Sequence, residues 1–258
     1  MESTTVIKAL GLLEALAMTG RGKSLAELAL EMRMPKPTAH RLLKTLSATG
    51  YVEKRDPGMY RPGPALARLA ARGADDILQG IAAPVLKELH RVTRETVNLG
   101  VLRHADVVYL KVLESPQPLR RVVTANSTDP FYCTALGRAI AAHLPSPQID
   151  FLLSTARLQK KTTSTVIDVA KLQRVLQEVH GSGYSIEVDQ TDVGVTCLAV
   201  PIFDTRGVRA AISLSVPSSR TDKLQNGKWL KLLQQGALRI TKQLKTGAVA
   251  QSEQGTDP

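Results

Sequence analysis

The amino-acid sequence predicts an α+β protein in which a small helical domain, closed by a β-hairpin, precedes a larger domain built on an antiparallel sheet. Three observations predict this fold class. Apolar residues recur at helical spacing through the first 50 residues, β-rich runs joined by short turns recur from residue 96 onward, and helical stretches separate the groups of strands. The length of 258 residues exceeds the usual size of one domain, so we expect two.

The composition is strongly basic. The formal net charge is +11 at pH 7, and residues 1–61 hold ten Lys and Arg against six Asp and Glu, which suits a polyanionic partner. Two cysteines without CxxC spacing and five scattered histidines indicate neither a disulfide scaffold nor a metal site, and we expect no cofactor. We find no signal peptide and no apolar run near the roughly 20 residues that cross a bilayer, so we expect a cytoplasmic protein with no membrane partner.

Residues 4–18 are predicted to form the first helix, and residues 24–50 a helical hairpin. Ser24 and Glu27 are spaced as a capping box at the start of the hairpin, and Gly50 ends its second helix. Pro35 and Pro37 suit the first turn of that second helix, where a missing N–H costs nothing. The expected buried side of the first helix holds Val6, Ile7, Leu10, Leu13, Leu16 and Ala17.

The second helix of the hairpin separates an apolar face from a polar and cationic face. Ala39, Leu42, Leu43 and Leu46 fall at i, i+3, i+4 and i+7, so we expect them to face inward. The outer face holds no carboxylate, as a helix that reads the major groove of DNA requires. A helical hairpin with a solvated basic face is the alternative. The outer residues are Lys36, Thr38, His40, Arg41, Lys44 and Thr45.

A short β-hairpin is predicted directly after this helix. Residues 51–54 and 59–61 read as its strands, and residues 56–58 as its turn. Lys54, Arg55 and Arg61 are placed to contact phosphate groups, although an ordinary solvated hairpin has the same composition. A hairpin at this place is typical of a winged helix-turn-helix, so the combination favours DNA binding more specifically than any of its parts.

We divide the chain into four parts. Residues 1–63 are the first domain, 64–74 a connector helix, 75–246 the second domain, and 247–258 a polar tail that we expect to be disordered. A longer helix is predicted from residue 75 to about residue 95, with Pro84 as a kink or a break. In the second domain the predicted strands are 96–102, 107–113, 120–123, 184–188, 196–202 and 210–216, and the predicted helices are 133–143, 148–153, 168–180 and 223–245.

Ordered motifs run through both domains. The first domain contains Leu25-Ala-Glu-Leu-Ala, Met34-Pro-Lys-Pro-Thr-Ala-His-Arg-Leu-Leu and Tyr60-Arg-Pro-Gly. The second contains Glu95-Thr-Val-Asn-Leu, Cys133-Thr-Ala-Leu-Gly-Arg-Ala, Gly194-Val-Thr-Cys-Leu-Ala-Val-Pro-Ile and Ala211-Ile-Ser-Leu-Ser. Together these pieces resemble, in order and from about residue 5 to residue 244, the IclR-type bacterial transcriptional regulators.

The resemblance implies a winged helix-turn-helix joined by a connector helix to a GAF/PAS-like effector-binding domain. It also implies a homodimer or a dimer of dimers on a palindromic, double-stranded DNA operator, and no enzyme activity. A small organic or aromatic acid is expected to bind the second domain and change the affinity for DNA. Most members of the family repress, which here implies repression of catabolic genes; activation is the alternative.

Carried over residue by residue, the resemblance gives a set of DNA-facing positions on the second hairpin helix. Arg41 is the expected base reader, because a guanidinium can pair bidentately with guanine O6 and N7; a phosphate contact is the alternative. The full set is Lys36, Pro37, Thr38, His40, Arg41 and Lys44, and the wing adds Lys54, Arg55 and Arg61.

The effector pocket that the resemblance implies is lined from three places. Ser213 and Ser215 are two apart on a strand, so their hydroxyls share one face, with bonds to neighbouring backbone as the alternative. Val188 and Gln190 stand where the family commonly has carboxylates, which puts in doubt any effector copied from a relative. The implied lining is Cys133, Thr134, Ala135, Leu136 and Gly137 at a helix start, Glu187, Asp192, Gly194 and Cys197 on a loop and strand, and the two serines.

Two other functions remain open on the residues alone. An enzyme would need Cys133 or Cys197 as a nucleophile beside a base, but the one histidine near either in sequence, His143, falls on another side of the predicted helix. A DNA-bound structural protein without a ligand is the second alternative. It predicts that removal of residues 75–258 leaves DNA affinity and its regulation unchanged.

Overall fold

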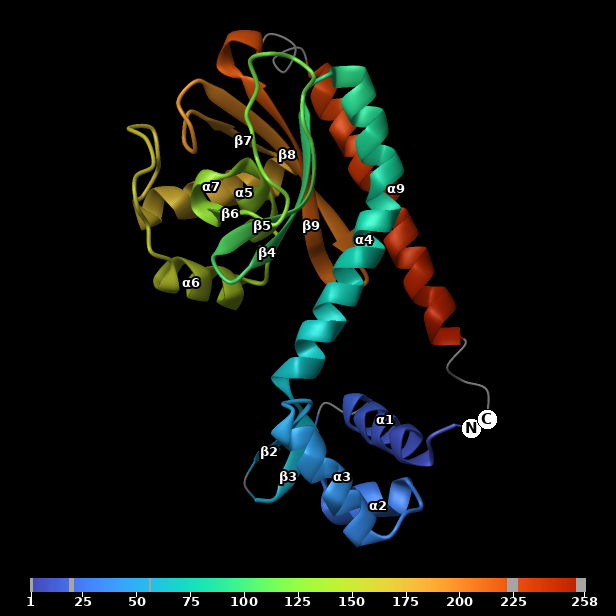
Figure 1. The fold of residues 1–258 in the computed structure, drawn as a ribbon. Coiled ribbons are helices and arrows are strands. Elements are labelled where there is room, and N and C mark those ends of the chain that lie inside the picture. The colour runs from blue at the N-terminus through green and yellow to red at the C-terminus, as the bar shows by residue number, and fades with distance from the viewer. Residues whose placement is uncertain (1, 19–20, 56, 222–226, 254–258) are drawn as a thin grey trace. The chain divides into compact units, whose positions relative to one another are not determined.

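A computed structural model describes residues 2–18, 21–55, 57–221 and 227–253, with side chains described up to residue 246 (Figure 1). The chain divides into two compact units, Met1–Asp76 and Ile77–Pro258. The division falls inside helix α4 (Pro64–Thr93). The predicted α+β class is confirmed, with helices and a small sheet in the first unit and an antiparallel sheet in the second.

In the first unit three helices pack around one apolar core. Leu12, Leu28, Leu43 and Val52 are fully or almost fully buried there. The predicted capping box is confirmed, because Ser24 and Glu27 satisfy each other's backbone N–H groups. The elements are α1 (Thr4–Ala17), β1 (Lys23–Ser24), α2 (Leu25–Glu31), α3 (Lys36–Ala48), β2 (Val52–Arg55) and β3 (Met59–Pro62), and the strands pair in the order β1-β3-β2. The short strand β1 was not predicted, and Asp56 of the predicted turn lies outside the described residues.

The buried side of α1 differs from the predicted one. Leu12, Ala15 and Leu16 are buried, whereas Val6, Ile7 and Leu10 are each 54% exposed. Apolar residues surround most of this helix, so periodicity alone could not choose the side that the core uses.

Helix α4 runs without interruption through both predicted breaks. The predicted connector helix of residues 64–74 and the longer helix predicted from residue 75 are one helix, because a glycine such as Gly73 inside a helix costs only about 0.5–1 kcal/mol relative to alanine. The predicted kink or break at Pro84 did not end the helix either. Ala82, Val85 and Leu86 flank Pro84 and are buried against the sheet, which holds the helix in place where one backbone hydrogen bond is missing.

The second unit is built on a six-stranded antiparallel sheet with the order β6-β5-β4-β9-β8-β7. Its strands are β4 (Thr96–Arg103), β5 (Asp106–Leu113), β6 (Thr128–Pro130), β7 (Ser185–Val188), β8 (Val195–Asp204) and β9 (Gly207–Pro217). The predicted strand at 120–123 is wrong. There the carbonyl of Arg121 accepts a hydrogen bond from the Thr96 hydroxyl instead of joining a strand ladder, and β6 at the edge of the sheet takes the expected place.

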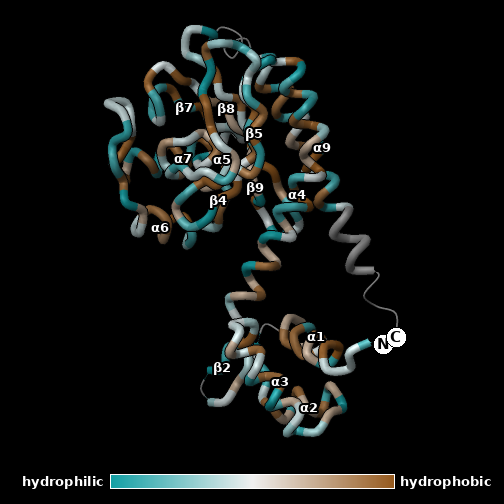
Figure 2. The backbone as a smooth tube through the Cα atoms, viewed as in Figure 1, coloured by the Kyte–Doolittle hydropathy of each residue, from teal (hydrophilic) through white to brown (hydrophobic). Residues whose placement is uncertain are grey.

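Helices cover both faces of this sheet (Figure 1). Residues 77–93 of α4 and helix α9 (Lys228–Glu253) cover one face, where Leu86, Leu214 and Trp229 share a core. Along α4 and α9 hydrophobic and hydrophilic residues alternate, as expected of helices with one face on a sheet (Figure 2). The other face carries the 3-10 turn η1 (Phe131–Cys133), α5 (Ala135–Ala141), α6 (Ser146–Thr155) and α7 (Val169–Ser182); the turn η2 (Ser218–Arg220) follows β9.

The chain after β9 departs from the prediction at both ends of its helix. Residues 223–226 of the predicted closing helix lie outside the described residues, and α9 begins at Lys228. We expected disorder from residue 247, but α9 continues to Glu253, since no proline interrupts it; residues 254–258 lie outside the described residues. In the described part of the chain no helix is long and apolar enough to cross a membrane.

Candidate functional site

The exposed face of α3 carries the predicted DNA-facing residues. Ala39, Leu42 and Leu43 are buried, and Leu46 packs partly buried against the same core, so the inward face is as predicted. This core therefore holds the opposite face of α3 toward solvent. Lys36, Pro37, His40, Arg41 and Lys44 are exposed and Thr38 is partly exposed.

The cations of this face are free of partners in the part of the chain that the structure describes. Among the described residues, the side chains of Lys36, Arg41 and Lys44 have no hydrogen-bond or ion-pair partner, and α3 contains no carboxylate. Thr45, also predicted to face outward, turns its hydroxyl back to the carbonyl of Arg41. The helix thus presents unpaired positive charge and donor groups, which suit phosphate and base edges.

The strands of the wing place its three cations on two faces. Side chains alternate along a strand, so Arg55 lies on one face of the hairpin and Lys54 on the other. Arg61 stands opposite Glu53 in the strand register, so it lies on the same face as Arg55. Lys54 lies over the ring of buried Tyr60, with 5.9 Å from Nζ to the ring centroid. Arg55 is paired with Glu53 at 3.1 Å. All three cations are exposed at a site that can contact phosphate, but they do not form one patch.

In the second unit a row of buried polar side chains crosses the sheet face that α5 covers. The strand register places Glu187 beside Cys197, and Cys197 beside Ser215, on β7, β8 and β9. Ser213 lies two residues before Ser215 and opposite Asn98 of β4. We call these five residues the polar row; each is 5% exposed or less.

Hydrogen bonds connect the polar row internally. The amide of Asn98 donates to the hydroxyls of Ser213 and Ser215, at 3.2 and 3.1 Å, which confirms that the two hydroxyls share one face. The thiol of Cys197 donates to Ser215, at 3.3 Å. The other amide atom, Asn98 Oδ1, is buried and has no partner among the described residues. An unpartnered buried acceptor is costly, and it marks a place where a donor from outside could bind.

Glu187 joins the polar row to the loop that precedes β8. Its carboxylate accepts hydrogen bonds from the backbone N–H of Gln190 and the hydroxyl of Thr191. The Thr191 hydroxyl also contacts the carbonyl of Cys133, at 2.8 Å, just before α5. Burial raises the pKa of Glu187 above its ordinary value, although the N–H of Gln190 opposes the shift.

The remaining predicted pocket residues have different roles. Thr134 caps α5 by accepting from the N–H of Gly137, where a Cβ would lie 2.4 Å from the backbone of Phe131. Ala135 and Leu136 are buried in the apolar core under α5. Gly194 lies in an exposed turn, with φ +80°, and is not part of the buried polar row. Asp192 lies on the same exposed loop.

The structure adds site residues that the sequence did not reveal. Arg121 is 9% exposed and bonds to Tyr109, Asp129 and Asp192 in a network beside the polar row. Asn98 could have been found, because it is the polar residue inside the predicted strand of residues 96–102, whose only other polar residue, Thr96, stands at its start. Arg121 carries no such signal in the sequence. Its neighbour Arg120 is also an arginine, yet the side chain of Arg120 is 36% exposed, so the residue type does not tell which of the two is buried.

The two cysteines are poorly suited to nucleophilic chemistry. Burial raises the pKa of Cys133 to about 11 and raises that of Cys197 well above its ordinary value. The thiolate is the nucleophile, so both would be unreactive near neutral pH. His143 is engaged elsewhere: its Nδ1 donates to the carbonyl of Ala139, at 3.0 Å, and its ring lies beside that of His180.

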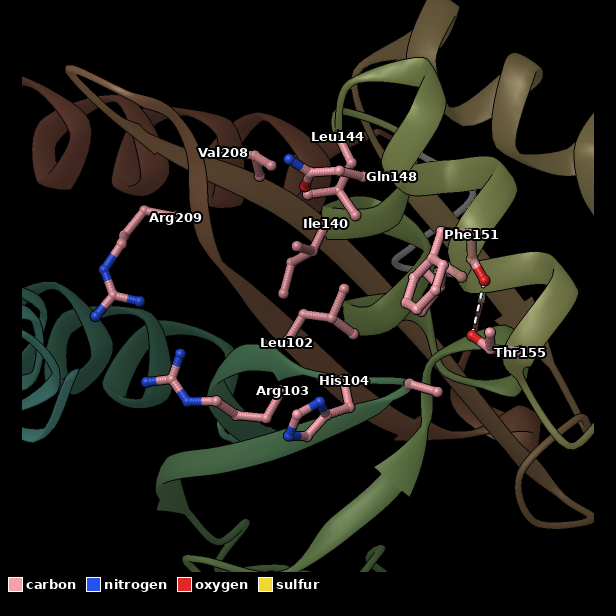
Figure 3. Close-up of a pocket in the computed structure, with 12 residues that line it drawn as sticks. Leu102, Arg103, His104, Ile140, Leu144, Gln148, Phe151, Thr155, Val208 and Arg209 are labelled. Carbon is pink, nitrogen blue, oxygen red and sulfur yellow. Dashed lines mark hydrogen bonds between the residues drawn. The ribbon is translucent and has the colours of Figure 1, made fainter. Parts of the chain in front are cut away.

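A separate cavity of about 640 Å³ lies at the C-terminal end of α5, where Ile140 and Leu144 line it (Figure 3). Leu102, Ile140 and Phe151 line it, and Arg103 and Arg209 extend along one side. None of the predicted pocket residues lines this cavity.

Comparisons with known proteins place both units in one family. The bacterial transcriptional regulator IclR C-terminal domain matches residues 74–242, and the IclR helix-turn-helix domain matches residues 5–56. The HTH-type transcriptional regulator KdgR of Escherichia coli (strain K12) is 29% identical over 244 residues, which cover 93% of this chain and 92% of KdgR. The HTH-type transcriptional repressor AllR of the same strain is 28% identical over 217 residues, which cover 83% of this chain and 80% of AllR.

Solved structures agree. The crystal structure of the Thermotoga maritima IclR has a TM-score of 0.64 and 25% identity, and the match covers 93% of this chain and 98% of that one. An IclR homolog from Microbacterium hydrocarbonoxydans, complexed with 4-hydroxybenzoate, has a TM-score of 0.62 and 24% identity, and the match covers 93% of this chain and 99% of that one. At 24% identity, the similarity to this second structure shows a shared fold and no more.

Proposed function

The chain belongs to the IclR family of DNA-binding bacterial transcriptional regulators, and from this premise we propose that a small organic acid bound in its second unit controls its affinity for an operator. We propose further that it acts as a repressor of catabolic genes, and that it binds a palindromic operator as a homodimer or a dimer of dimers. The relative AllR is itself a repressor, which supports this direction of control. A protein of this function works in the cytoplasm, where the DNA is.

The DNA half of the proposal is supported by the exposed face of α3. Lys36, His40, Arg41 and Lys44 form a face without a carboxylate, and the helix is held outward by a buried apolar face. Arg41 is our choice as base reader, while Lys54, Arg55 and Arg61 of the wing give phosphate contacts that add affinity without sequence discrimination.

The effector half is carried by one observation, the polar row. A sheet face packed under a helix is normally apolar, since burying a polar group costs free energy unless it is hydrogen-bonded. Here five neighbouring positions, from Glu187 on β7 to Asn98 on β4, are polar or a thiol and are buried, and Asn98 Oδ1 is left without a partner. Such a group suits recognition of a small polar ligand better than stability alone.

Replacement of Ser213 and Ser215 by alanine tests the proposal. The operator is first selected from random DNA with the purified full chain, and release of the operator by organic acids, including 4-hydroxybenzoate, is then titrated by fluorescence anisotropy. We expect Ser213→Ala/Ser215→Ala to raise the acid concentration for half-release at least about tenfold, because each lost hydrogen bond is worth about 1 kcal/mol, while operator affinity without acid stays unchanged.

The matched control is Ser154→Ala, an exposed serine of α6 whose hydroxyl donates to the carbonyl of Phe151 and has no other hydrogen bond among the described residues. It should respond to acid as the wild type does. A double variant with a normal response would mean that the pocket is elsewhere. If no acid changes the operator affinity of the wild type, the chain is a DNA-bound protein without an organic-acid effector.

A further inference from the structure

We propose that Arg121 binds the carboxylate of the effector, and that the carboxylate of Asp192 occupies this place while no effector is bound. The inference rests on the proposed function, because it assigns the anchor of the same ligand. It adds a residue outside the implied lining, and it gives Asp192 the role of an internal competitor rather than a direct ligand contact.

The guanidinium of Arg121 is almost completely enclosed by three partners. Its Nη1 donates to the Tyr109 hydroxyl at 3.0 Å, its Nη2 to Asp129 Oδ2 at 2.9 Å, and its Nε to Asp192 Oδ2 at 2.8 Å. A guanidinium offers its donors in a rigid planar fork that matches a carboxylate. Two of the three partners of Arg121 are therefore carboxylates, the group that an organic acid would bring.

The two carboxylates on Arg121 differ in how firmly they are held. Asp129 is 14% exposed and is also bound by the ammonium of Lys161 and the hydroxyl of Tyr109. Asp192 is 53% exposed, and Arg121 is the only hydrogen-bond partner of its side chain among the described residues, although the charge of Lys161 also reaches it. Only the carboxylate of the Arg121–Asp192 pair is half exposed, so water can replace the one hydrogen bond that Asp192 loses on leaving, whereas Asp129 would lose several inside the fold. A second carboxylate can therefore displace Asp192 far more easily than Asp129.

Arg121 lies near the polar row, because the ring of Tyr109, whose hydroxyl it holds, packs in the same buried cluster as Cys197. Its positive charge lowers the pKa of both Cys197 and Glu187, against the larger effect of their burial, so the guanidinium lies within electrostatic reach of two members of the row. The hydroxyl of Tyr109, which Arg121 holds, comes from β5, next to β4 of the row. A ligand whose carboxylate binds Arg121 would have its body directed at these strands.

The loop of residues 189–194 connects Arg121 with the question of how a ligand reaches the polar row. The polar row is buried, so part of the chain must move before a ligand can reach it. This loop is our candidate for that part, because it carries Asp192 and the exposed Val193 and Gly194. The bond from Arg121 to Asp192 is one of several that hold this loop; Gln190 also bonds to Thr165, and Thr191 to the carbonyl of Cys133. A ligand that takes Arg121 from Asp192 removes the first of these bonds, and the number of carboxylates on Arg121 stays the same because Asp192 moves into water.

Calorimetric titration of the full chain tests the proposal. The probes are acetate, lactate, benzoate and 4-hydroxybenzoate, each compared with its uncharged amide. We expect the wild type to bind at least one acid ten or more times more tightly than the amide, and Arg121→Gln to abolish that preference. Asp192→Asn should tighten the same acid about two- to tenfold, since a neutral amide competes less well for the guanidinium than a carboxylate.

The matched control is Arg120→Gln, the same change one residue earlier, where the side chain pairs with Glu114 instead; it should bind the acids as the wild type does. An acid preference that survives Arg121→Gln would overturn the anchor. Unchanged acid binding by Asp192→Asn, a variant of a half-exposed side chain that leaves the fold intact, would overturn the competition even if Arg121→Gln failed to fold.

Operator release separates this inference from the proposed function. If an acid releases the operator equally from the wild type and from Arg121→Gln, the effector function stands and the anchor is wrong. If no acid of the series binds the wild type or changes its operator affinity, both are wrong.

Discussion

Adjacent residues of the same type meet opposite environments in this protein. The side chain of Arg120 is 36% exposed and pairs with Glu114, whereas that of Arg121 is 9% exposed and bonds to three groups from three different segments. The arginines of α3 and the wing differ in a similar way, because Arg41 is unpaired within the described chain and Arg55 is paired with Glu53. The role of an arginine here depends on its partners and not on its charge.

Arg41→Ala should therefore weaken specific operator binding by about 1–3 kcal/mol and relax the preference at one base pair, as loss of a bidentate base contact does. Competition between operator variants in a fluorescence anisotropy assay measures both effects. Arg55→Ala is the comparison: it should weaken binding to all sequences alike and make the salt dependence shallower, as loss of a phosphate contact does. An Arg41 variant with unchanged base preference would show that Arg41 contacts phosphate only.

At the scale of elements, helix ends follow local signals only where the chain has no competing packing. Gly183 ends α7 in the left-handed conformation, with φ +75°, as a glycine at this position commonly does. Gly73 looks like the same signal in the sequence but lies inside α4, where its position is exposed and an added Cβ would meet nothing within 4 Å. Tertiary packing of α4 on the sheet of the second unit outweighs the weak propensity of one glycine.

The same substitution, glycine to alanine, should therefore change the free energy of unfolding in opposite directions at Gly73 and at Gly183. Gly73→Ala should stabilise the protein by about 0.5–1 kcal/mol, because alanine loses less conformational entropy inside a helix. Gly183→Ala should destabilise it by about 1–2 kcal/mol, because alanine is strained in the left-handed region. Urea unfolding followed by circular dichroism gives both values. A destabilising Gly73→Ala would mean that the helix ends near residue 73 in solution.

At the scale of the whole molecule, charge couples stability to pH. Twenty-three carboxylates reduce the positive charge of 34 Lys and Arg, so acidification raises a net charge that is already +11. Within this background the buried carboxylates act in opposite directions. Burial tends to raise the pKa of Asp129, but Lys161 and Arg121 outweigh it and hold this pKa below its ordinary value of 3.8. For Glu187 burial prevails, and its pKa lies above its ordinary value of 4.5.

The signs give a pH prediction. A lowered folded-state pKa means that ionised Asp129 stabilises the fold above about pH 4, and that this contribution disappears as the pH falls through the folded-state value. Asp129→Asn should therefore lower the urea midpoint at pH 7, and this deficit relative to the wild type should shrink progressively as the pH falls below about 4. Asp150→Asn, a change at an exposed carboxylate, should not show this pattern. A deficit of Asp129→Asn that persists undiminished at low pH would contradict the ion-pair role. Glu187 works in the opposite sense, since its raised pKa favours the fold below about pH 4.5 and the benefit is lost as the pH rises through the folded-state value.

The sequence predicted much of this fold, because several signals were local. Ser24 with Glu27, the inward spacing of Ala39, Leu42 and Leu43, and the alternation that pairs Ser213 with Ser215 depend only on neighbours a few residues away. For the same reason the sequence alone determined the fold class and the polar outer face of α3, and its ordered motifs resembled the family to which the chain belongs.

Only the tertiary structure decided which groups meet across the chain. The bonds of Arg121 to Tyr109, Asp129 and Asp192, the pairing of Asn98 with serines more than 100 residues away, and the choice of the buried side of α1 all depend on contacts between distant segments. Periodicity carries no information about such contacts, because it reports only which residues share a face of one element. The α3 surface belongs to one helix, so its residues could be predicted from the sequence. The candidate effector site is made of contacts between distant segments, so most of it could not.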